Sequence, residues 1–410
     1  MRSILLLAST SLLAACGGGG LQTVSAPPPA AGGGSGAADP HTFANPTDAK
    51  TYVGVGGSQV YEYLTDARGC CNQQAQIYAG KTTTVRNSTI SITYDPADAV
   101  YTLEVQDPLS GAAARTRFQD PASRTDFGGN LEPQWGTPEL SNGNIEYYQA
   151  GDGNPLSPYR ESGSGFINPG DNDNPPTGET GSSYQAASLF VLRPGAETQY
   201  VTFAGYVRNA LTFSESTAGT DTFETTNWHL ERGAFAYGET TLSDAVPTTG
   251  TGSYQGSMLA SMIFNPTLDG QSSAGSAVLP SFFQWIEGSS TLDVNFADDS
   301  FELALIGTVL APQLDYYTSS PDTVLSAGAT FNASAEGLIN LINFGGFKGQ
   351  FDSAYFTNPG GDRHDVAIAG STIDGAFYGP NGEEAGGGFR IVGGTPDERI
   401  DILGAFVGVK

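Results

Sequence analysis

Histidine, cysteine and the short motifs of common enzymes are scarce or missing in this chain. The 410 residues include three cysteines and three histidines, and His41, His229 and His364 are far apart in the sequence. No local pair has the spacing of metal ligands. The sequence also lacks the nucleophile elbow, the zinc-protease motif, the Walker loop and the dinucleotide-binding loop. We therefore predict a protein that is not an enzyme and that holds no metal or cofactor.

Positive charge is also in short supply. Lysine and arginine total 17 against 43 aspartates and glutamates, so the formal net charge is −26. Nucleic-acid binding depends on clustered basic residues that release counterions from phosphates. The few basic residues here are scattered among acids, which excludes nucleic acid as a partner. A strong negative charge also helps to keep a crowded surface protein soluble.

Long apolar runs are absent after the first residues of the chain. No later segment approaches the ~20 apolar residues that cross a bilayer as a helix. Residues 1–15 contain Arg2, a short apolar core and small residues before Cys16, a pattern typical of a secretory signal. Cys16 at the cleavage point resembles a bacterial lipobox, which implies a lipid on its thiol, and Gly17 after it implies the outer membrane. The alternative is a plain signal peptide in which Cys16 is incidental.

Residues 16–42 are rich in glycine, proline and alanine and poor in large apolar side chains. Such a segment cannot bury enough surface to fold, and its glycines are flexible while its prolines are extended. We interpret it as a tether between the lipid and the folded part. The lipid is then the only expected attachment to the membrane, since each buried methylene contributes about 0.8 kcal/mol and two or three acyl chains anchor stably.

The remaining cysteines, Cys70 and Cys71, are adjacent. They can close a strained disulfide in an oxidising compartment, or they can belong to a rigid turn without redox function. The absence of a Cys-x-x-Cys context favours the turn.

The rest of the chain has the alternating pattern of antiparallel β-strands. Residues 88–94 and 99–105 alternate around a turn at 95–98, and apolar side chains alternate again over 292–296 and 301–305. We expect an all-β fold. Residues 336–343 are the exception, because they have the pattern of a short helix that a glycine and two asparagines weaken.

Between about residues 134 and 181 the alternation stops, and glycine, proline, asparagine and aspartate prevail. Long irregular segments are usually functional or disordered. The interspersed Tyr147, Tyr148, Tyr159 and Phe166 could bind a partner, or could pack beneath the segment. A second turn-rich stretch near residues 245–252 divides the folded part into two expected domains, 43–245 and 246–410.

Residues 373–389 carry a motif in which a strand end, a tight turn and a glycine-rich strand start follow one another. Its members are Gly375, Phe377, Tyr378, Gly379, Pro380, Glu384, Gly386 and Gly387. The motif resembles the C-terminal barrel of transferrin-binding protein B-like surface lipoproteins. Residues 247–256 look like the entry to that barrel, and residues 200–206 and 235–238 look like the last strands of the preceding handle domain. The resemblance implies an antiparallel handle domain followed by an eight-stranded up-and-down β-barrel.

Within this motif Glu383 and Glu384 could be mistaken for a catalytic pair of carboxylates. Adjacent side chains in a strand or turn diverge to opposite sides, and the resemblance implies a structural turn. We therefore expect no catalysis here.

The resemblance implies a lipid-anchored outer-membrane protein displayed on the cell surface, which captures a protein or an iron- or haem-bearing ligand beside a TonB-dependent transporter. The alternative is a structural or adhesive lipoprotein without a soluble ligand. Exposed aromatic residues on loops are favoured anchors for partners. We select Tyr159, Phe166, Tyr316 and Tyr317 as candidates; Tyr316 and Tyr317 could instead cap the barrel mouth.

Overall fold

The computed structural model describes residues 43–66, 81–106, 111–119, 140–151, 183–266, 282–310, 325–342, 345–395 and 398–410. Every regular element in these ranges is a β-strand, and every strand pairing is antiparallel. The all-β fold expected from the sequence is therefore confirmed. No helix long and apolar enough to cross a membrane occurs in these ranges.

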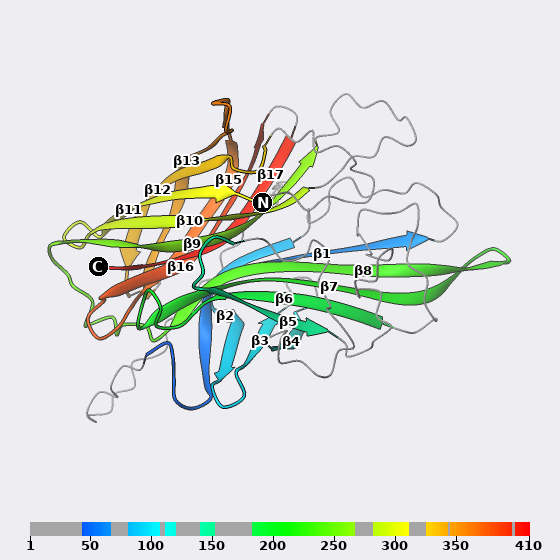
Figure 1. Cartoon of the computed structure of the whole chain (residues 1–410), viewed down its shortest axis with the longest axis horizontal. Helices are drawn as coiled ribbons and strands as arrows, with labels where there is room; N and C mark the ends of the chain where they lie inside the picture. The colour runs from blue at the N-terminus through cyan, green and yellow to red at the C-terminus, as the bar shows by residue number, and fades with distance from the viewer. Residues whose placement is uncertain are drawn as a thin grey trace, which may run out of the picture.

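The first sheet, which we call the handle sheet, has eight strands in the order β4-β3-β2-β1-β8-β7-β6-β5. It is built from β1 (Lys50–Asp66), β2 (Lys81–Asp95), β3 (Val100–Gln106), β4 (Ala113–Phe118), β5 (Ile145–Gly151), β6 (Ser183–Leu192), β7 (Val201–Ala218) and β8 (Asp221–Gly238). The edge strands β4 and β5 touch, so the sheet curls round on itself. Its strands run from blue to green in Figure 1.

The second sheet closes into a barrel. Its strands are β9 (Thr251–Pro266), β10 (Phe282–Asn295), β11 (Ser300–Val309), β12 (Thr330–Asn340), β13 (Gly346–Thr357), β14 (Arg363–Asp365), β15 (Ala367–Tyr378), β16 (Glu384–Thr395) and β17 (Glu398–Val409). The ladders β9–β17 and β12–β13 complete the ring of eight strands, and the short β14 lies beside β13 as an addition. The expected eight-stranded up-and-down barrel is confirmed.

The hairpins predicted from local sequence patterns are confirmed, whereas the predictions for two other segments are wrong. β2 pairs with β3 and β10 pairs with β11 as the alternation predicted. Residues 336–340 are strand, not helix, because β12 pairs with β11 and β13 on both sides. Residues 145–151 are strand β5, so the expected irregular insertion is ordered at this point.

Three apolar cores hold these sheets. One fills the barrel, with Phe301, Phe347 and Phe377 at its centre. A second fills the concave side of the handle sheet and is rich in tyrosine, such as Tyr101 and Tyr148. The third lies between the two sheets. Its handle members are Phe190, Leu192, Val201, Phe203, Val207, Phe213, Leu230, Ala234 and Ala236, and its barrel members are Leu259, Ile263, Phe283, Trp285, Ala376, Tyr378, Ala405 and Val407.

Candidate functional site

The two ends of the barrel differ in how their strands are connected. At one end the strands β10–β11, β12–β13 and β15–β16 are joined by the tight turns 296–299, 341–345 and 379–383. At the other end β9–β10 and β11–β12 are joined by long connections that include residues 267–281 and 311–324, while β16–β17 is joined by residues 396–397. We call these the tight-turn end and the long-connection end.

The handle sheet also has long connections at one of its ends. Its β1–β2 and β5–β6 connections, residues 67–80 and 152–182, are long and leave from one end of the sheet. Its opposite end is fastened to the tight-turn end of the barrel, where Thr241 donates from Oγ1 to the carbonyl of Gly379 at 2.7 Å. These four connections therefore begin on the same side of the molecule, toward the right in Figure 1, whereas the long β4–β5 connection, residues 119–144, begins at the fastened end of the handle sheet. Loops on a rigid scaffold are the usual place for binding residues.

Glu384 is the main fastener at the tight-turn end. Its carboxylate accepts from the backbone N–H groups of Gln199 at 2.6 Å, Tyr200 at 2.7 Å and Val201 at 3.0 Å. Burial raises the pKa of Glu384, and these three donors act in the opposite direction. Glu383 accepts instead from the backbone and side-chain nitrogens of Asn381. The two glutamates thus serve different loops and form no catalytic pair.

Glu287 on β10 captures another loop. Its carboxylate accepts from the backbone N–H of Ser141 at 2.7 and 2.9 Å and from that of Asn142 at 3.3 Å. The segment that leads into β5 is therefore tied to the barrel wall. Backbone donors bound to an ionised carboxylate make strong hydrogen bonds, so both carboxylates hold handle loops against the barrel.

A buried ionic network lies in the interface between the sheets. The side chain of Arg232 on β8 is 0% exposed, and it donates to Asp401 Oδ1 at 3.0 Å and to the Ser261 carbonyl at 2.7 Å. Arg390 also donates to Asp401, at 2.6 and 3.0 Å, and Arg399 does so at 3.3 Å. Burial would raise the pKa of Asp401, but Arg232 and Arg390 outweigh it, and the net pKa is lowered. Gln59 on β1 donates from Nε2 to Asp401 Oδ2 at 3.1 Å, so β1, β8, β16 and β17 are joined through one carboxylate.

The glycines of the motif permit the closest backbone contact between the sheets. A Cβ on Gly388 would lie 2.3 Å from the Cα of Gly56 on β1, a distance that real side chains do not tolerate. A Cβ on Gly386 would meet Val201 and Ala236 at 3.1 and 3.2 Å. β16 can therefore lie directly against β1 only while these positions lack side chains.

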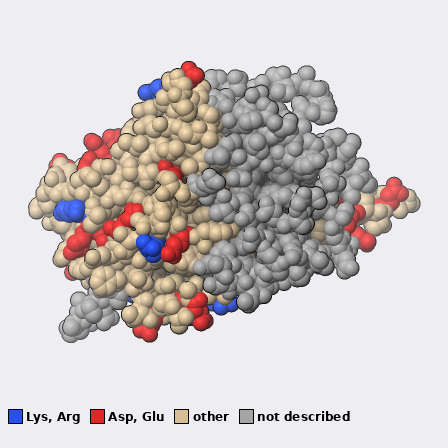
Figure 2. Space-filling model, in the orientation of Figure 1, with Lys and Arg blue, Asp and Glu red and all other residues tan. Residues whose placement is uncertain are grey.

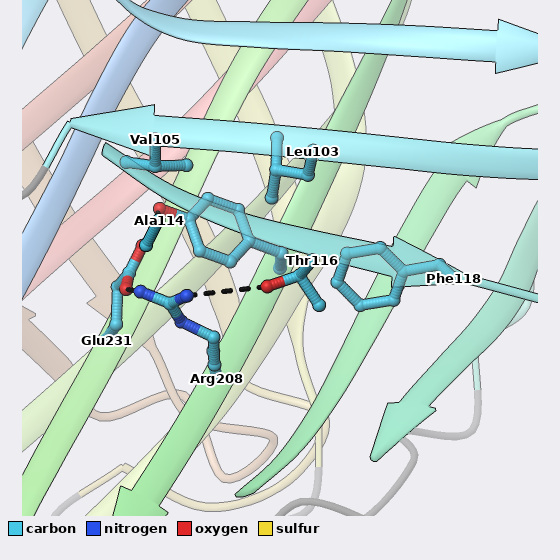
Figure 3. Close-up of a pocket in the computed structure, with 8 residues that line it drawn as sticks. Leu103, Val105, Ala114, Thr116, Phe118, Arg208 and Glu231 are labelled. Atoms are coloured by element: carbon cyan, nitrogen blue, oxygen red, sulfur yellow. Dashed lines mark hydrogen bonds and ion pairs between the residues drawn. The ribbon is translucent and has the colours of Figure 1, made fainter. Parts of the chain in front are cut away.

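The concave side of the handle sheet contains a second buried ion pair, drawn in Figure 3. Arg208 on β7 pairs with Glu231 on β8 and donates to Thr116 Oγ1 at 3.3 Å. Tyr206 donates to Glu231 at 2.6 Å, and His229 lies 3.4 Å from it. The surrounding wall is mainly apolar and consists of Leu103, Val105, Ala114 and Phe118. Both carboxylate oxygens of Glu231 contact side chains of the handle sheet, so this niche stabilises that sheet.

The histidine of this niche bridges two carboxylates. His229 Nδ1 lies 3.0 Å from Glu62, while its Nε2 faces Glu231. Burial lowers the pKa of His229, but the hydrogen bonds to Glu231 and Glu62 outweigh it and the net pKa is raised. In the described ranges no group of three or more histidine, cysteine or acidic residues could hold a metal ion.

The candidate residues from the sequence fall in two classes. Cys16, Cys70, Cys71, Tyr159, Phe166, Tyr316 and Tyr317 lie outside the described residues. The motif residues lie at the tight-turn end: Phe377 is in the barrel core, Tyr378 is in the core between the sheets, Gly375 packs under Phe347, Gly387 lies against the backbone of β15, and Gly379 and Pro380 form the turn. Tyr147 and Tyr148 pack against the cores between the sheets and of the handle, so their role is structural.

Sequence reasoning missed the interface network. Arg232 lies on the same face of β8 as Leu230, Ala234 and Ala236, and this face packs against the barrel. An arginine on the apolar face of a strand is the signal that could have identified it.

Comparison with known proteins identifies the barrel. Residues 246–410 match the family model described as the C-lobe and N-lobe β-barrels of transferrin-binding protein B. No curated protein sequence matches the chain.

Similar solved structures carry the same family name. They include a transferrin-binding protein B variant from Haemophilus parasuis (14% identity, 90% of this chain and 78% of that chain, TM-score 0.27) and the intact Ap-TbpB with both lobes (13%, 90% and 78%, 0.26). A third is the isotype 1 protein from serogroup B Neisseria meningitidis (12%, 89% and 77%, 0.21). Because these TM-scores are below 0.5, the assignment rests on the family match. Residues 246–410 therefore match the family of transferrin-binding protein B lobe barrels, and this part of the chain is transferrin-binding protein B-like.

Proposed function

We propose that this protein captures an iron-bearing protein, or a haem-bearing ligand, at the bacterial surface and passes it to a TonB-dependent transporter. The observation that carries this proposal is the match of residues 246–410 to a family named for transferrin binding.

The arrangement of the connections supports this role. Both sheets are fastened at the tight-turn end by Glu384 and in their interface by Arg232 and Asp401. Four long connections, residues 67–80, 152–182, 267–281 and 311–324, leave from the other side. Tyr159 and Phe166 belong to residues 152–182, and Tyr316 and Tyr317 to residues 311–324, two of these connections. We propose that the ligand binds on this side.

We further propose that Cys16 carries the lipid that holds the chain in the outer membrane. The thiol is the group that acyl transfer requires, and serine cannot replace it. A Cys16→Ser protein should partition into the aqueous phase in a detergent phase-separation assay, whereas the unaltered protein should enter the detergent phase. If the variant still enters the detergent phase after release from cells, this part of the proposal is wrong.

The ligand is tested with the detergent-solubilised full chain. Iron-loaded transferrin, iron-free transferrin and haemoglobin are each passed over the immobilised protein, and haem is titrated in solution and followed by its absorbance. We expect one of these probes to bind with a dissociation constant below about 1 µM. A preference for the iron-loaded over the iron-free form would identify the protein ligand. Absence of binding by every probe up to about 100 µM would favour a structural or adhesive lipoprotein instead.

A further inference from the structure

The outer wall of the barrel carries a groove that the proposed function does not use. It encloses about 620 Å³ where β11, β12, β13 and β15 lie side by side. Its lining includes Glu302, Glu336, Leu338, Gln350, Asp352 and Thr372. The glutamates, Leu338, Gln350 and Asp352 are exposed, and they alternate with side chains of the barrel core.

Three of the carboxylates in this groove have no neutralising partner. Glu302 on β11 lies directly opposite Glu336 on β12, and Glu336 lies opposite Gln350 on β13. Like charges directly opposite each other destabilise a sheet. Within the described ranges, Glu302, Glu336 and Asp352 have neither an ion pair nor a hydrogen bond. The fold therefore bears an electrostatic cost at this place that a cationic ligand would remove.

The backbone is irregular at the same place. The β12–β13 ladder shifts register between Ser334 and Ala335, so that Asp352 is the extra residue of a β-bulge. Bulges redirect side chains and are enriched beside functional sites. On its other edge β13 pairs with β15 over only the three residues 347–349 before it pairs with β14. The β13–β15 ladder therefore ends at residue 349, and the groove lies beside this point.

A buried hydroxyl in the lining provides independent evidence for a ligand. Thr372 on β15 is 9% exposed, and its Oγ1 has no hydrogen-bond partner. The next residue, Ile373, points into the barrel core, so Thr372 faces the outer side of the wall, where the groove lies. A buried hydroxyl without a partner costs about 1–3 kcal/mol. A polar group of a ligand in the groove would satisfy it.

We propose that this groove binds a lysine- or arginine-rich segment of a protein partner. The lining holds four carboxylates and one ammonium group, that of Lys348, which lies opposite Asp374 in the β13–β15 ladder. The other three carboxylates, from Glu302, Glu336 and Asp352, make the lining complementary to positive charge. Leu338, which is 62% exposed, provides an apolar contact for the stem of a long basic side chain. In Figure 2 acidic residues are spread widely over the visible barrel surface while basic residues are few. This general field steers a basic segment toward the barrel, and the groove selects where it binds.

The test uses the full chain in detergent and a fluorescein-labelled decapeptide that contains four lysines and two leucines. Binding is measured by fluorescence anisotropy at about 50 mM salt, below physiological strength so that screening is weak. The double variant Glu302→Gln/Glu336→Gln should bind the peptide at least about tenfold more weakly than the unaltered protein. A peptide with glutamates in place of the lysines should not bind.

A matched control exists on the handle sheet. Glu215 and Glu224 also lie directly opposite each other, on β7 and β8, and they line no described groove. The variant Glu215→Gln/Glu224→Gln removes the same charge, and we expect it to change peptide affinity by less than about twofold. Equal weakening by the two double variants would mean that only the net charge attracts the peptide, and it would overturn the proposal.

Thr372→Val distinguishes a ligand contact from a structural role. The variant removes the unpartnered hydroxyl while it keeps the shape, so stability should be unchanged or higher. We expect peptide affinity to fall about threefold or more. Unchanged affinity in both Thr372→Val and the groove double variant would refute the proposal. Capture of transferrin or haem by the same variants is measured in parallel. The groove lies toward the tight-turn end, since its residues Ser300 and Leu338 are paired beside the tight turns. Loss of one activity with retention of the other therefore separates the two proposals.

Discussion

The barrel and the handle sheet solve the same packing problem in different ways. The barrel closes, so each of its strands has two neighbours and its core is enclosed by its own wall. The handle sheet ends in two edge strands and curls without closing. Its concave face packs on the tyrosine-rich core, and its other face packs against the barrel. Closure removes free sheet edges. We infer that the stability of the handle sheet depends on the barrel more than the stability of the barrel depends on the handle sheet.

The polar groups in the interface follow the same asymmetry. Arg232 projects from the handle into the barrel and ends on Asp401, a residue that Arg390 of the barrel already holds. Without the handle, Asp401 keeps two guanidinium partners from its own sheet. Without the barrel, Arg232 loses the Asp401 carboxylate and the Ser261 carbonyl and keeps its hydrogen bond to Gln59. The barrel therefore needs fewer partners from outside.

The largest expected effect is on the separated halves. Residues 246–410 should unfold in one cooperative transition when produced alone, because their core is internal. Residues 43–245 should show broad, noncooperative melting, because the face that packs on the barrel becomes exposed. Circular dichroism during heating measures both. A broad transition for the barrel fragment would mean that the halves share one indispensable core.

Next in size is the loss of the buried carboxylate. Asp401→Ala leaves three guanidinium groups without their acceptor, and removal of one partner from a buried ionic network costs about 3–5 kcal/mol. The free energy of unfolding in urea measures this. Asp365→Ala is the control, since its ion pair with Arg363 is exposed and is worth about 0–1 kcal/mol. Equal costs for the two variants would contradict the role of the network.

Contact between the backbones of β16 and β1 comes third. Gly388→Ala introduces a Cβ 2.3 Å from the Cα of Gly56, so the sheets must separate locally. Overpacking of this kind costs about 1–3 kcal/mol. Gly143→Ala has no atom within 4 Å of the new Cβ and should be neutral. The melting temperatures of both variants measure this difference. An unchanged melting temperature for Gly388→Ala would show that the sheets are not in close contact at this point.

The smallest effect is a pH dependence confined to the handle. The raised pKa of His229 means that its contribution to stability is fully present below about pH 6.5, the unfolded value, and is lost as pH rises through the folded pKa. His229→Gln should therefore destabilise the protein more at pH 5.5 than at pH 9. Urea titrations at the two pH values measure the difference. The same destabilisation at both would show that the imidazolium is not favoured by Glu231 and Glu62.

Much of the fold could be predicted because alternation and the motif carry local information. The hairpins at residues 95–99 and 296–299 follow from period-two patterns, and the motif at 373–389 implied the barrel. Residues 336–343 misled because their apolar residues, at 338, 339, 341 and 342, recur at the spacing of a helix and do not alternate, and pairing on both edges decided the outcome. Asp401 and Arg232 could not be assigned, since the partner of a buried charge comes from a distant strand. The partner-binding residues chosen from the sequence remain predictions.

The central claim is that the ligand binds on the long-connection side of this fastened pair of sheets. It is tested most directly by the dissociation constant of the captured ligand for Tyr159→Ala, Phe166→Ala and the Tyr316→Ala/Tyr317→Ala double variant. Leu242→Ala, an exposed apolar residue near the tight-turn end, is the control. We predict a loss of more than about 1 kcal/mol of binding free energy in at least one of the three, with melting temperature retained, and no loss in the control. Unchanged affinity in all three well-folded variants would contradict the claim.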